Sequence, residues 1–375
     1  MRDLTLLAQV PSREELRERI PHRERFRPEP RLLCEPQLRI REDGTGDLLL
    51  PRRGSWKHIH ELHVEVVRAL AAGGDMAAAI ERAKPACPPK LVTHTEKLVR
   101  RFVWMMHKEG IVEVPLEAPP ERFADRFRRV RELGRGGMGI VHLCADEARA
   151  DAPVVVKHAW GWTKPVERAE RSIREEARAM AKFDHPRIPP LVDAFEQDGL
   201  LHLVRDFAPG DGLHARPTRL LLGTSQARLA TLRECLKILG HIHERGMLYM
   251  DVKPENFVLE SVEKGPFLLD FGLCRPLENG AIKLRGAVGS AGYAAPEVVK
   301  KHVATEASDV YSLGRTFAFV ATGKRLRFKH DEAAVVAALD EAGVAGVERE
   351  ILARMCADDP ERRYANTGAV LDAIP

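Results

Sequence analysis

Two neighbouring stretches decide the fold of this chain: YMDVKPEN at residues 249–256 and LDFG at residues 269–272. They place aspartate, lysine and asparagine at close, fixed offsets, followed by a second aspartate beside a phenylalanine and a glycine. Carboxylate and amide oxygens are ligands that Mg²⁺ prefers, and a nearby lysine can neutralise a phosphate. Transfer of a phosphoryl group needs such charge stabilisation and alignment more than covalent chemistry. The pattern therefore indicates phosphate chemistry.

A glycine-rich segment, LGRGGMGIV at residues 133–141, precedes these stretches and contains the pattern G-x-G-x-x-G-x-V. By themselves its glycines also fit a plain hairpin or a dinucleotide site. A dinucleotide site needs a helix directly after the glycines, whereas Val141 and Leu143 alternate as in a strand. A glycine hairpin between two strands can instead offer backbone N–H groups to phosphates. Downstream, VVVK at residues 154–157 ends a further predicted strand on Lys157.

Together these motifs resemble the eukaryotic-type, or Hanks-type, serine/threonine protein kinases, from about residue 123 to the C-terminus. The resemblance implies an α+β class and a two-lobed kinase fold over residues 127–375. It places a small β-rich N-lobe at about 127–207 and a larger helical C-lobe at about 208–375. It also implies ATP and Mg²⁺ as cofactors and transfer of the γ-phosphate to serine or threonine hydroxyls of a protein substrate.

The resemblance assigns roles to individual residues. Asp251 is expected to be the catalytic base or hydroxyl-orienting group and Lys253 to contact the γ-phosphate, while Asn256 and Asp270 bind metal. Lys157 is expected to hold the α- and β-phosphates and to pair with a helix glutamate, with Glu176 as first choice and Glu175 as second. The remaining expected nucleotide-binding positions are Leu133, Gly134, Arg135, Gly136, Gly137, Met138, Gly139, Val141, Val155, Asp206 and Ala208.

Further motifs in the C-terminal half favour a protein substrate. Glu297, in Ala-Pro-Glu at 295–297, closes the activation segment of the family, and Arg363 matches its buried partner. Asp309 matches a residue of the helix that braces the catalytic loop, as does Gly314. Small-molecule kinases of related fold generally lack the Ala-Pro-Glu motif. A kinase-like pseudokinase scaffold and a small-molecule kinase remain the alternatives.

Two departures from the family bear on regulation. Met250 replaces the arginine that normally pairs with a phosphorylated activation loop, which makes this a non-RD sequence. Residues 273–288 contain no serine, threonine or tyrosine, so the usual phosphosite is absent as well. We therefore expect activity that does not depend on activation-loop phosphorylation: the kinase is either constitutively competent or controlled through its N-terminal module.

Other departures lie around the adenine pocket and the catalytic loop. Arg205 falls at the gatekeeper position, where it can narrow or reshape the pocket or turn outward to a carboxylate. Val155 replaces the alanine above adenine. Tyr249 keeps an aromatic ring that can stack under Phe271, and Ser290 retains the hydroxyl expected near the catalytic aspartate.

The N-terminal third divides into three expected parts: a charged, extended arm over residues 1–50, a winged-helix-like module over 51–116 and a linker over 117–126. The module is predicted to contain a helix from Lys57, a short helix capped by Asp75, a third helix over about 93–108 and a strand over 111–114. Its third helix carries basic residues that suit a DNA backbone, although docking onto the kinase or a peptide or protein partner is favoured. These basic residues are His94, Lys97, Arg100, Arg101, His107 and Lys108.

Composition limits the remaining functions. The 375 residues carry a net charge of only +4, which rules out a global basic field for nucleic acid. Neither a membrane span nor a secretory signal is predicted, and the six scattered cysteines favour reduced thiols, so a cytoplasmic location is expected. His58, His60 and His63 form H-x-H-x-x-H, but a metal site is disfavoured because residues 58 and 60 of a helix point to different faces.

Overall fold

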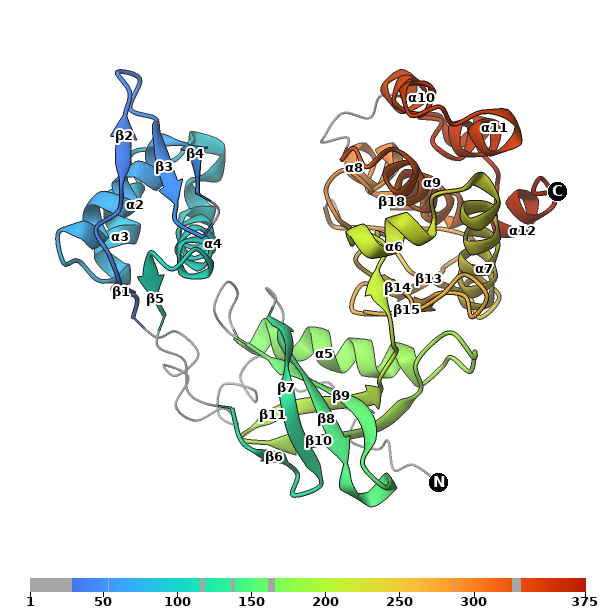
Figure 1. The fold of residues 1–375 in the computed structure, drawn as a ribbon, viewed down its shortest axis with the longest axis horizontal. Coiled ribbons are helices and arrows are strands. Elements are labelled where there is room, and N and C mark those ends of the chain that lie inside the picture. The colour runs from blue at the N-terminus through green and yellow to red at the C-terminus, as the bar shows by residue number, and fades with distance from the viewer. Residues whose placement is uncertain are drawn as a thin grey trace.

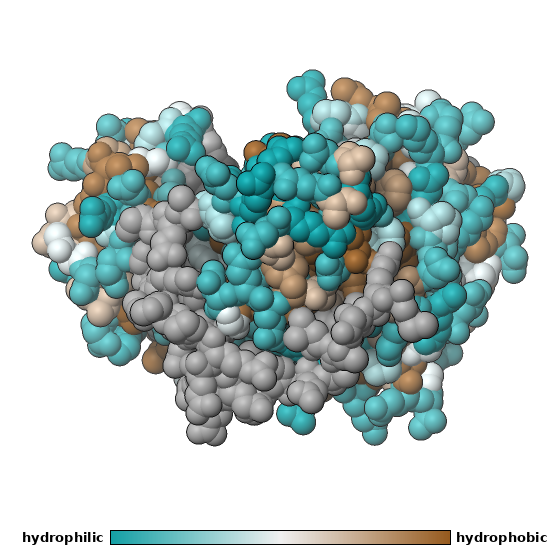
Figure 2. Space-filling model, turned by 90° about the horizontal axis from the view of Figure 1, so that it is seen from below, coloured by the Kyte–Doolittle hydropathy of each residue, from teal (hydrophilic) through white to brown (hydrophobic). Residues whose placement is uncertain are grey.

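The computed structural model describes residues 29–375 except 53, 115–118, 136–138, 161–165, 287 and 326–331. Figure 1 shows an N-terminal unit, a curled sheet beside one long helix, and a larger, mainly helical part. Figure 2 shows one face on which hydrophilic residues cover most of the described surface and apolar residues form small groups. Within the described ranges, no helix combines the length and apolar character that crossing a membrane requires.

The N-terminal unit joins two small antiparallel sheets to a group of helices. In the first sheet β3 lies between β2 and β4, and in the second β1 pairs with β5. Buried residues of α2, α3 and α4 form its core. The elements are β1 (Arg31–Leu32), β2 (Leu38–Ile40), β3 (Gly46–Leu50), β4 (Ser55–Ile59), α2 (Glu61–Ala71), α3 (Met76–Ala83), η3 (Pro89–His94), α4 (Thr95–Lys108) and β5 (Val112–Glu113).

This unit differs from the sequence-based expectation at its start. The arm expected over residues 1–50 contains strands β1, β2 and β3 within its described part, 29–50. The helix expected from Lys57 begins at Glu61, because Ser55–Ile59 pairs along its whole length with β3. The pairing strand β3 lies upstream in the sequence, so the helical spacing of the apolar residues after Lys57 does not reveal this strand. The predicted Asp75 cap is confirmed, since its carboxylate accepts a hydrogen bond from Ala78 N.

The three histidines considered as metal ligands have separate roles in this unit. His58 Nδ1 lies 3.2 Å from an Asp47 carboxylate oxygen, and the His60 ring caps α2 by accepting from Leu62 N. The His63 ring stacks on Phe102 with centroids 4.4 Å apart. Across the described ranges, no group of three or more histidine, cysteine, aspartate or glutamate side chains is arranged to hold a metal ion.

A six-stranded antiparallel sheet in the order β10-β11-β9-β8-β7-β6 forms the N-lobe, and α5 lies against one face of it (Figure 1). The strands expected at Val141 and Leu143 and up to Lys157 are confirmed as β8 and β9. Gly139 is required in β8, because a Cβ there would lie 2.3 Å from the His158 carbonyl oxygen. The elements are β6 (Arg122–Phe123), β7 (Phe127–Arg135), β8 (Gly139–Asp146), η4 (Glu147–Arg149), β9 (Ala152–Ala159), α5 (Val166–Met180), β10 (Leu191–Gln197) and β11 (Leu200–Asp206).

The C-lobe is built around α9, which is buried at every residue from Ala307 to Val320. The neighbouring helices α7 and α11 pack on α9, and the strands of this lobe form small sheets of two or three strands. The expected two-lobed α+β fold is confirmed. The elements are β12 (Asp211–Gly212), α6 (Arg216–Leu221), α7 (Ser225–His243), β13 (Met247–Leu248), β14 (Phe257–Leu259), β15 (Phe267–Leu268), β16 (Arg275–Pro276), β17 (Ile282–Lys283), α8 (Pro296–Lys300), β18 (Val303–Ala304), α9 (Glu306–Thr322), α10 (Glu332–Glu341), α11 (Gly346–Met355), η5 (Pro360–Arg362) and α12 (Thr367–Leu371).

Three histidines from neighbouring strands stack on one another in the N-lobe sheet. The His158 ring lies between His142 and His202, with ring centroids 5.4 and 4.9 Å away, and Phe123 of β6 contacts all three. Burial lowers the pKa of His142 and of His202 to about 4, and it lowers the pKa of His158 well below its ordinary value. The folded protein therefore holds these rings neutral.

The stack makes stability sensitive to acid. Because His142 binds a proton at an ordinary pKa of about 6.5 when unfolded and at about 4 when folded, the free energy of unfolding falls as pH drops through this window. Between pH 7 and pH 4.5 we expect the free energy of unfolding to fall less in His142→Phe than in wild type. The two decreases should differ by more than about 1 kcal/mol. Urea denaturation at several pH values measures this difference. His94→Phe, a change at an exposed histidine, is the control. The same dependence of the free energy of unfolding on pH in wild type and His142→Phe would contradict the prediction.

Candidate active site

Lys157 of β9 connects the sheet to α5 and to the LDFG stretch. Its Nζ lies 2.6 Å from Glu176 Oε2 and 3.3 Å from Asp270 Oδ1. Burial by itself would lower the pKa of Lys157, but the carboxylates of Asp270 and Glu176 outweigh burial and raise it. The lysine in turn lowers the pKa of Asp270. The first-choice glutamate is therefore the one beside Lys157, whereas Glu175 lies 2.7 Å from Arg275.

Three side chains hold the Asp251 carboxylate. Lys253 Nζ lies 2.5 Å from Oδ2, and Ser290 Oγ donates to Oδ1 over 2.8 Å. Asn256 Nδ2 donates to both the backbone oxygen and Oδ2 of Asp251, at 2.9 and 3.1 Å. The structure thus brings the predicted catalytic and metal-binding residues of this loop together and fixes the direction of the carboxylate.

Asp309 of α9 braces the catalytic loop from below. Its carboxylate oxygens accept hydrogen bonds from the backbone N–H groups of Tyr249 and Met250, each at 2.9 Å, and His243 Nε2 lies 3.0 Å away. Met250 has a φ of 62° and Asp270 a φ of 63°, a left-handed conformation that non-glycine residues rarely adopt. The brace supplies interactions that keep the loop in this strained form.

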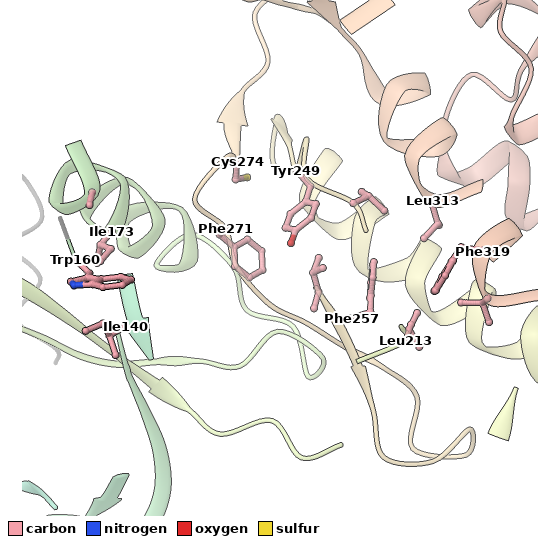
Figure 3. Packing of buried hydrophobic residues seen from close by; sticks show 14 of the residues in the cluster. Ile140, Trp160, Ile173, Leu213, Tyr249, Phe257, Phe271, Cys274, Leu313 and Phe319 are labelled. Carbon is pink, nitrogen blue, oxygen red and sulfur yellow. The ribbon is translucent and has the colours of Figure 1, made fainter. Parts of the chain in front are cut away.

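Phe271 fills the space between the two lobes. Its ring meets Tyr249 edge-on with centroids 5.5 Å apart (Figure 3). The ring centroid of Phe183 lies 5.4 Å away. The Tyr249 hydroxyl donates to the Leu269 carbonyl oxygen, and Phe271 is fully buried. The two rings are therefore in contact edge-on rather than stacked, and they tie the LDFG stretch to the catalytic loop.

The predicted Glu297–Arg363 pair is present beneath the activation segment. The two guanidinium nitrogens Nη1 and Nη2 each donate to a Glu297 oxygen over 2.8 Å, and Ser308 adds a hydrogen bond to the same carboxylate. Both residues are buried. Breaking a buried pair by removing one partner is strongly destabilising, so this contact fixes the end of the segment on the C-lobe.

The glycine-rich hairpin is described at its two sides. Leu133, Gly134 and Arg135 belong to β7, while Gly139 and Val141 belong to β8, and Gly134 lies opposite Val141. Gly136, Gly137 and Met138 lie outside the described residues.

The other expected nucleotide-binding residues lie on β9 and at the end of β11. Val155 precedes Lys157 by two residues on β9, so both side chains are on the same face of the sheet. Asp206 ends β11 and its carboxylate pairs with Arg149 at 2.8 Å. Ala208 is buried just beyond the strand.

The structure decides between the two conformations considered for Arg205. Its guanidinium does not reach an exposed carboxylate but donates from Nη1 to the backbone oxygen of Asp206 over 3.0 Å. Burial lowers the pKa of Arg205, and the negative charges of Glu176 and Asp270 partly offset this effect. Because Arg205 lies opposite Val155 of β9, its side chain is on the same face of the sheet as that of Lys157.

A contact between the N-terminal unit and the N-lobe has no signal in the sequence. The Trp104 ring of α4 meets Trp160, the residue after β9, edge-on with centroids 4.7 Å apart. The Arg135 guanidinium lies over the same Trp160 ring at 4.9 Å, and Trp160 is 3% exposed. Because the aromatic partners are far apart in sequence, only the folded chain shows that α4 reaches the glycine-rich hairpin.

The fold and this arrangement of residues define a protein kinase domain. The chain belongs to the protein kinase family, since the family described as protein kinase domain matches residues 127–369. It is 31% identical over 204 residues to calcium/calmodulin-dependent protein kinase cmkA of Emericella nidulans, covering 53% of this chain and 48% of that protein. It is 28% identical over 270 residues to serine/threonine-protein kinase B of Synechocystis, covering 68% and 47%. The chain thus spans about half the length of these curated relatives.

The residues present fit the cofactors that this family uses, ATP and Mg²⁺. Asp270 stays ionised because Lys157 lowers its pKa, and its side chain is 45% exposed. The Asn256 amide makes its hydrogen bonds to Asp251 through Nδ2, which leaves the carbonyl oxygen as the end of the amide that suits a cation. An oxygen-only donor set of this kind is typical of a magnesium site with bound phosphate.

Proposed function

We propose that this protein transfers the γ-phosphate of a nucleoside triphosphate to serine or threonine hydroxyls of a protein substrate. The observation that carries the proposal is the assembled pair of clusters, Lys157–Glu176–Asp270 beside Asp251–Lys253–Asn256. A binding scaffold has no need for both clusters with formed hydrogen bonds and an oriented carboxylate. The names of the relatives, which are serine/threonine and calcium-dependent kinases, support the same class.

The arrangement assigns a step to each residue. The Asp251 carboxylate accepts the hydrogen bond of the attacking hydroxyl and holds its oxygen in line with the phosphorus. Lys253 and Lys157 place positive charge where the phosphate oxygens gain negative charge, and Glu176 keeps Lys157 in position. Asn256 and Asp270 would hold Mg²⁺, which supplies further neutralisation of phosphate charge when bound.

A protein substrate is favoured over a small molecule. Ser290 connects the start of the peptide-binding segment to Asp251, and the Glu297–Arg363 pair fixes its end. The segment between them is therefore attached at both ends, as a surface that supports an extended peptide requires. A small-molecule kinase and a kinase-like scaffold are the competing functions.

Asp251→Asn tests chemistry against scaffolding. The amide keeps the shape and the contact with Ser290 but cannot accept a proton, so we expect phosphate transfer to fall at least about 100-fold while nucleotide affinity stays near that of wild type. Radiolabel transfer to a serine/threonine peptide library and calorimetric titration with ATP measure the two quantities. Asp340→Asn, which changes an exposed aspartate paired with Arg349, is the control. Equal transfer by Asp251→Asn and wild type would refute the proposed chemistry.

We propose further that activity does not depend on phosphorylation of the activation segment. Met250, at the place of the usual arginine, packs with Leu277, Ile282 and Leu284 of that segment against a buried apolar cluster. Strand β17 of the segment also pairs with β18, Ile282 opposite Ala304. Apolar contact and strand pairing thus supply the attachment that a phosphate–arginine pair would otherwise provide.

Removal of phosphate is the corresponding test. We expect treatment with a broad phosphatase to leave kcat unchanged within about twofold, because nothing in residues 273–288 accepts a phosphate. Intact-mass and peptide mass spectrometry before and after treatment establish the phosphorylation state. An activating phosphate on Ser290 or Tyr293, with loss of activity on its removal, would show that the proposal is wrong.

We propose that the N-terminal unit docks on its own kinase domain and controls the glycine-rich hairpin, rather than binding DNA. Two basic residues of the predicted recognition helix are engaged internally: Arg100 is buried and pairs with Glu96 at 2.9 Å, and His107 contacts the backbone of Val112 and Val114. The same helix carries Trp104, which contacts the kinase N-lobe. The alternative is that this winged-helix-like unit binds a separate peptide or protein partner.

Trp104→Ala measures this coupling. Loss of the aromatic contact with Trp160 removes about 0.5–1.5 kcal/mol of stabilisation from Trp160 and the Arg135 side of the hairpin. We therefore expect KM for ATP to rise about two- to tenfold. Steady-state kinetics at several ATP concentrations measure the change. Trp56→Ala is the matched control, since Trp56 contacts Arg39 within the N-terminal unit. An unchanged KM for ATP in Trp104→Ala would contradict docking of the N-terminal unit beside the glycine-rich hairpin.

A further inference from the structure

Arg205 is an unusual group to find at the inner end of a nucleotide pocket. Its backbone pairs with Val155 in β9 and Leu191 in β10, so it lies in the middle of the sheet rather than at an edge. Its register opposite Val155 puts its side chain on the same face of the sheet as that of Lys157. The Arg205 side chain therefore lies on the face of the sheet where the proposed function places the purine base.

The guanidinium already uses one of the polar groups that border this position. Arg205 Nη1 donates to the backbone oxygen of Asp206 over 3.0 Å. Under the proposed function, the backbone of residues 206–208 lies along the edge of the base. The Asp206 carbonyl is thus engaged by an internal donor before any nucleotide amino group can donate to it.

The chemistry of the guanidinium discriminates between purines. Arginine carries only N–H donors and no acceptor. At the C6 position adenine presents an amino group, which is a donor, whereas guanine presents a carbonyl oxygen, which is an acceptor. A donor-only cation next to C6 therefore opposes the amino group and can donate to the oxygen.

A second feature of the same segment suits a 6-oxo purine. Strand β11 ends at Asp206, so the backbone N–H and C=O of Ala208 lie beyond the sheet ladder. Guanine and hypoxanthine carry an acceptor oxygen at C6 next to an N1–H donor, and these two groups match the N–H and C=O of one residue. Recognition of this kind does not need the Asp206 carbonyl.

We propose that Arg205 is a specificity-determining residue that reduces the preference for adenine, so that the kinase accepts 6-oxo purine nucleotides such as GTP and ITP as phosphate donors alongside ATP. This inference rests on the proposed function for the location of the base, and it adds the nucleotide class. It differs from a purely structural role for Arg205, in which the residue would support Glu176 and affect all nucleotides equally.

The test compares nucleotide affinities in wild type and Arg205→Met. Calorimetric titration with the Mg²⁺ complexes of ATP, GTP and ITP gives dissociation constants without any need for turnover. We expect the GTP/ATP and ITP/ATP ratios of Kd to lie within about tenfold of one for wild type and to rise at least tenfold in Arg205→Met. ITP lacks the C2 amino group, so agreement between GTP and ITP locates the effect at C6.

Control variants separate specificity from folding. Arg233→Met removes an arginine that bonds the carbonyl oxygens of Ile374 and Pro375, far from the sheet, and should leave the ratios unchanged. If Arg205→Met does not fold by circular dichroism, Arg205→Gln replaces it, because glutamine supplies both a donor and an acceptor and should move the ratios in the same direction.

Each outcome decides the inference. If the GTP/ATP and ITP/ATP ratios of Kd shift as expected, the result supports the inference even when no phosphate transfer is seen. In that case only the proposed kinase activity is refuted. Equal losses of affinity for ATP, GTP and ITP in Arg205→Met indicate the structural role and overturn the inference. Wild-type protein that binds ATP but neither GTP nor ITP at millimolar concentration overturns it as well.

Discussion

The contact between Lys157, Glu176 and Asp270 is the interaction on which the rest of the structure depends. It joins a strand of the sheet, the helix α5 and the LDFG stretch of the C-lobe at a single point. Removing one partner would leave an uncompensated charge in a largely buried place, which proteins strongly disfavour. The two lobes are consequently held in the geometry that phosphate transfer requires, and Phe271 can fill the space between them.

A second constraint acts on the C-lobe side, through the brace from Asp309 to the catalytic loop. The backbone of Tyr249 and Met250 is held by one buried carboxylate, while the side chain of Met250 belongs to an apolar cluster with the activation segment. Loop geometry and segment position are therefore set by the same two residues. This explains why an apolar side chain is compatible with a formed active site at a position where the family usually has a cation.

Much of the site could be predicted because its residues lie in short motifs whose spacing is imposed by chemistry. Asp251, Lys253 and Asn256 share one loop, and Glu176, the first choice from the family pattern, is the glutamate that lies beside Lys157. The direction of Arg205 could not be predicted, because an inward or outward rotamer depends on neighbours from other strands. Likewise the start of α2 was misplaced, since β4 forms only through pairing with an upstream strand.

The sequence by itself determined the class of fold, the catalytic loop and the absence of a phosphate acceptor in residues 273–288, because these depend on residue type and local spacing. Only the tertiary structure decided which apolar residues pack against the activation segment, how α4 of the N-terminal unit reaches Trp160 beside the glycine-rich hairpin, and that Arg205 donates to the backbone oxygen of Asp206. Each of these is a contact between segments far apart in the chain, where burial and partner geometry outweigh local preference.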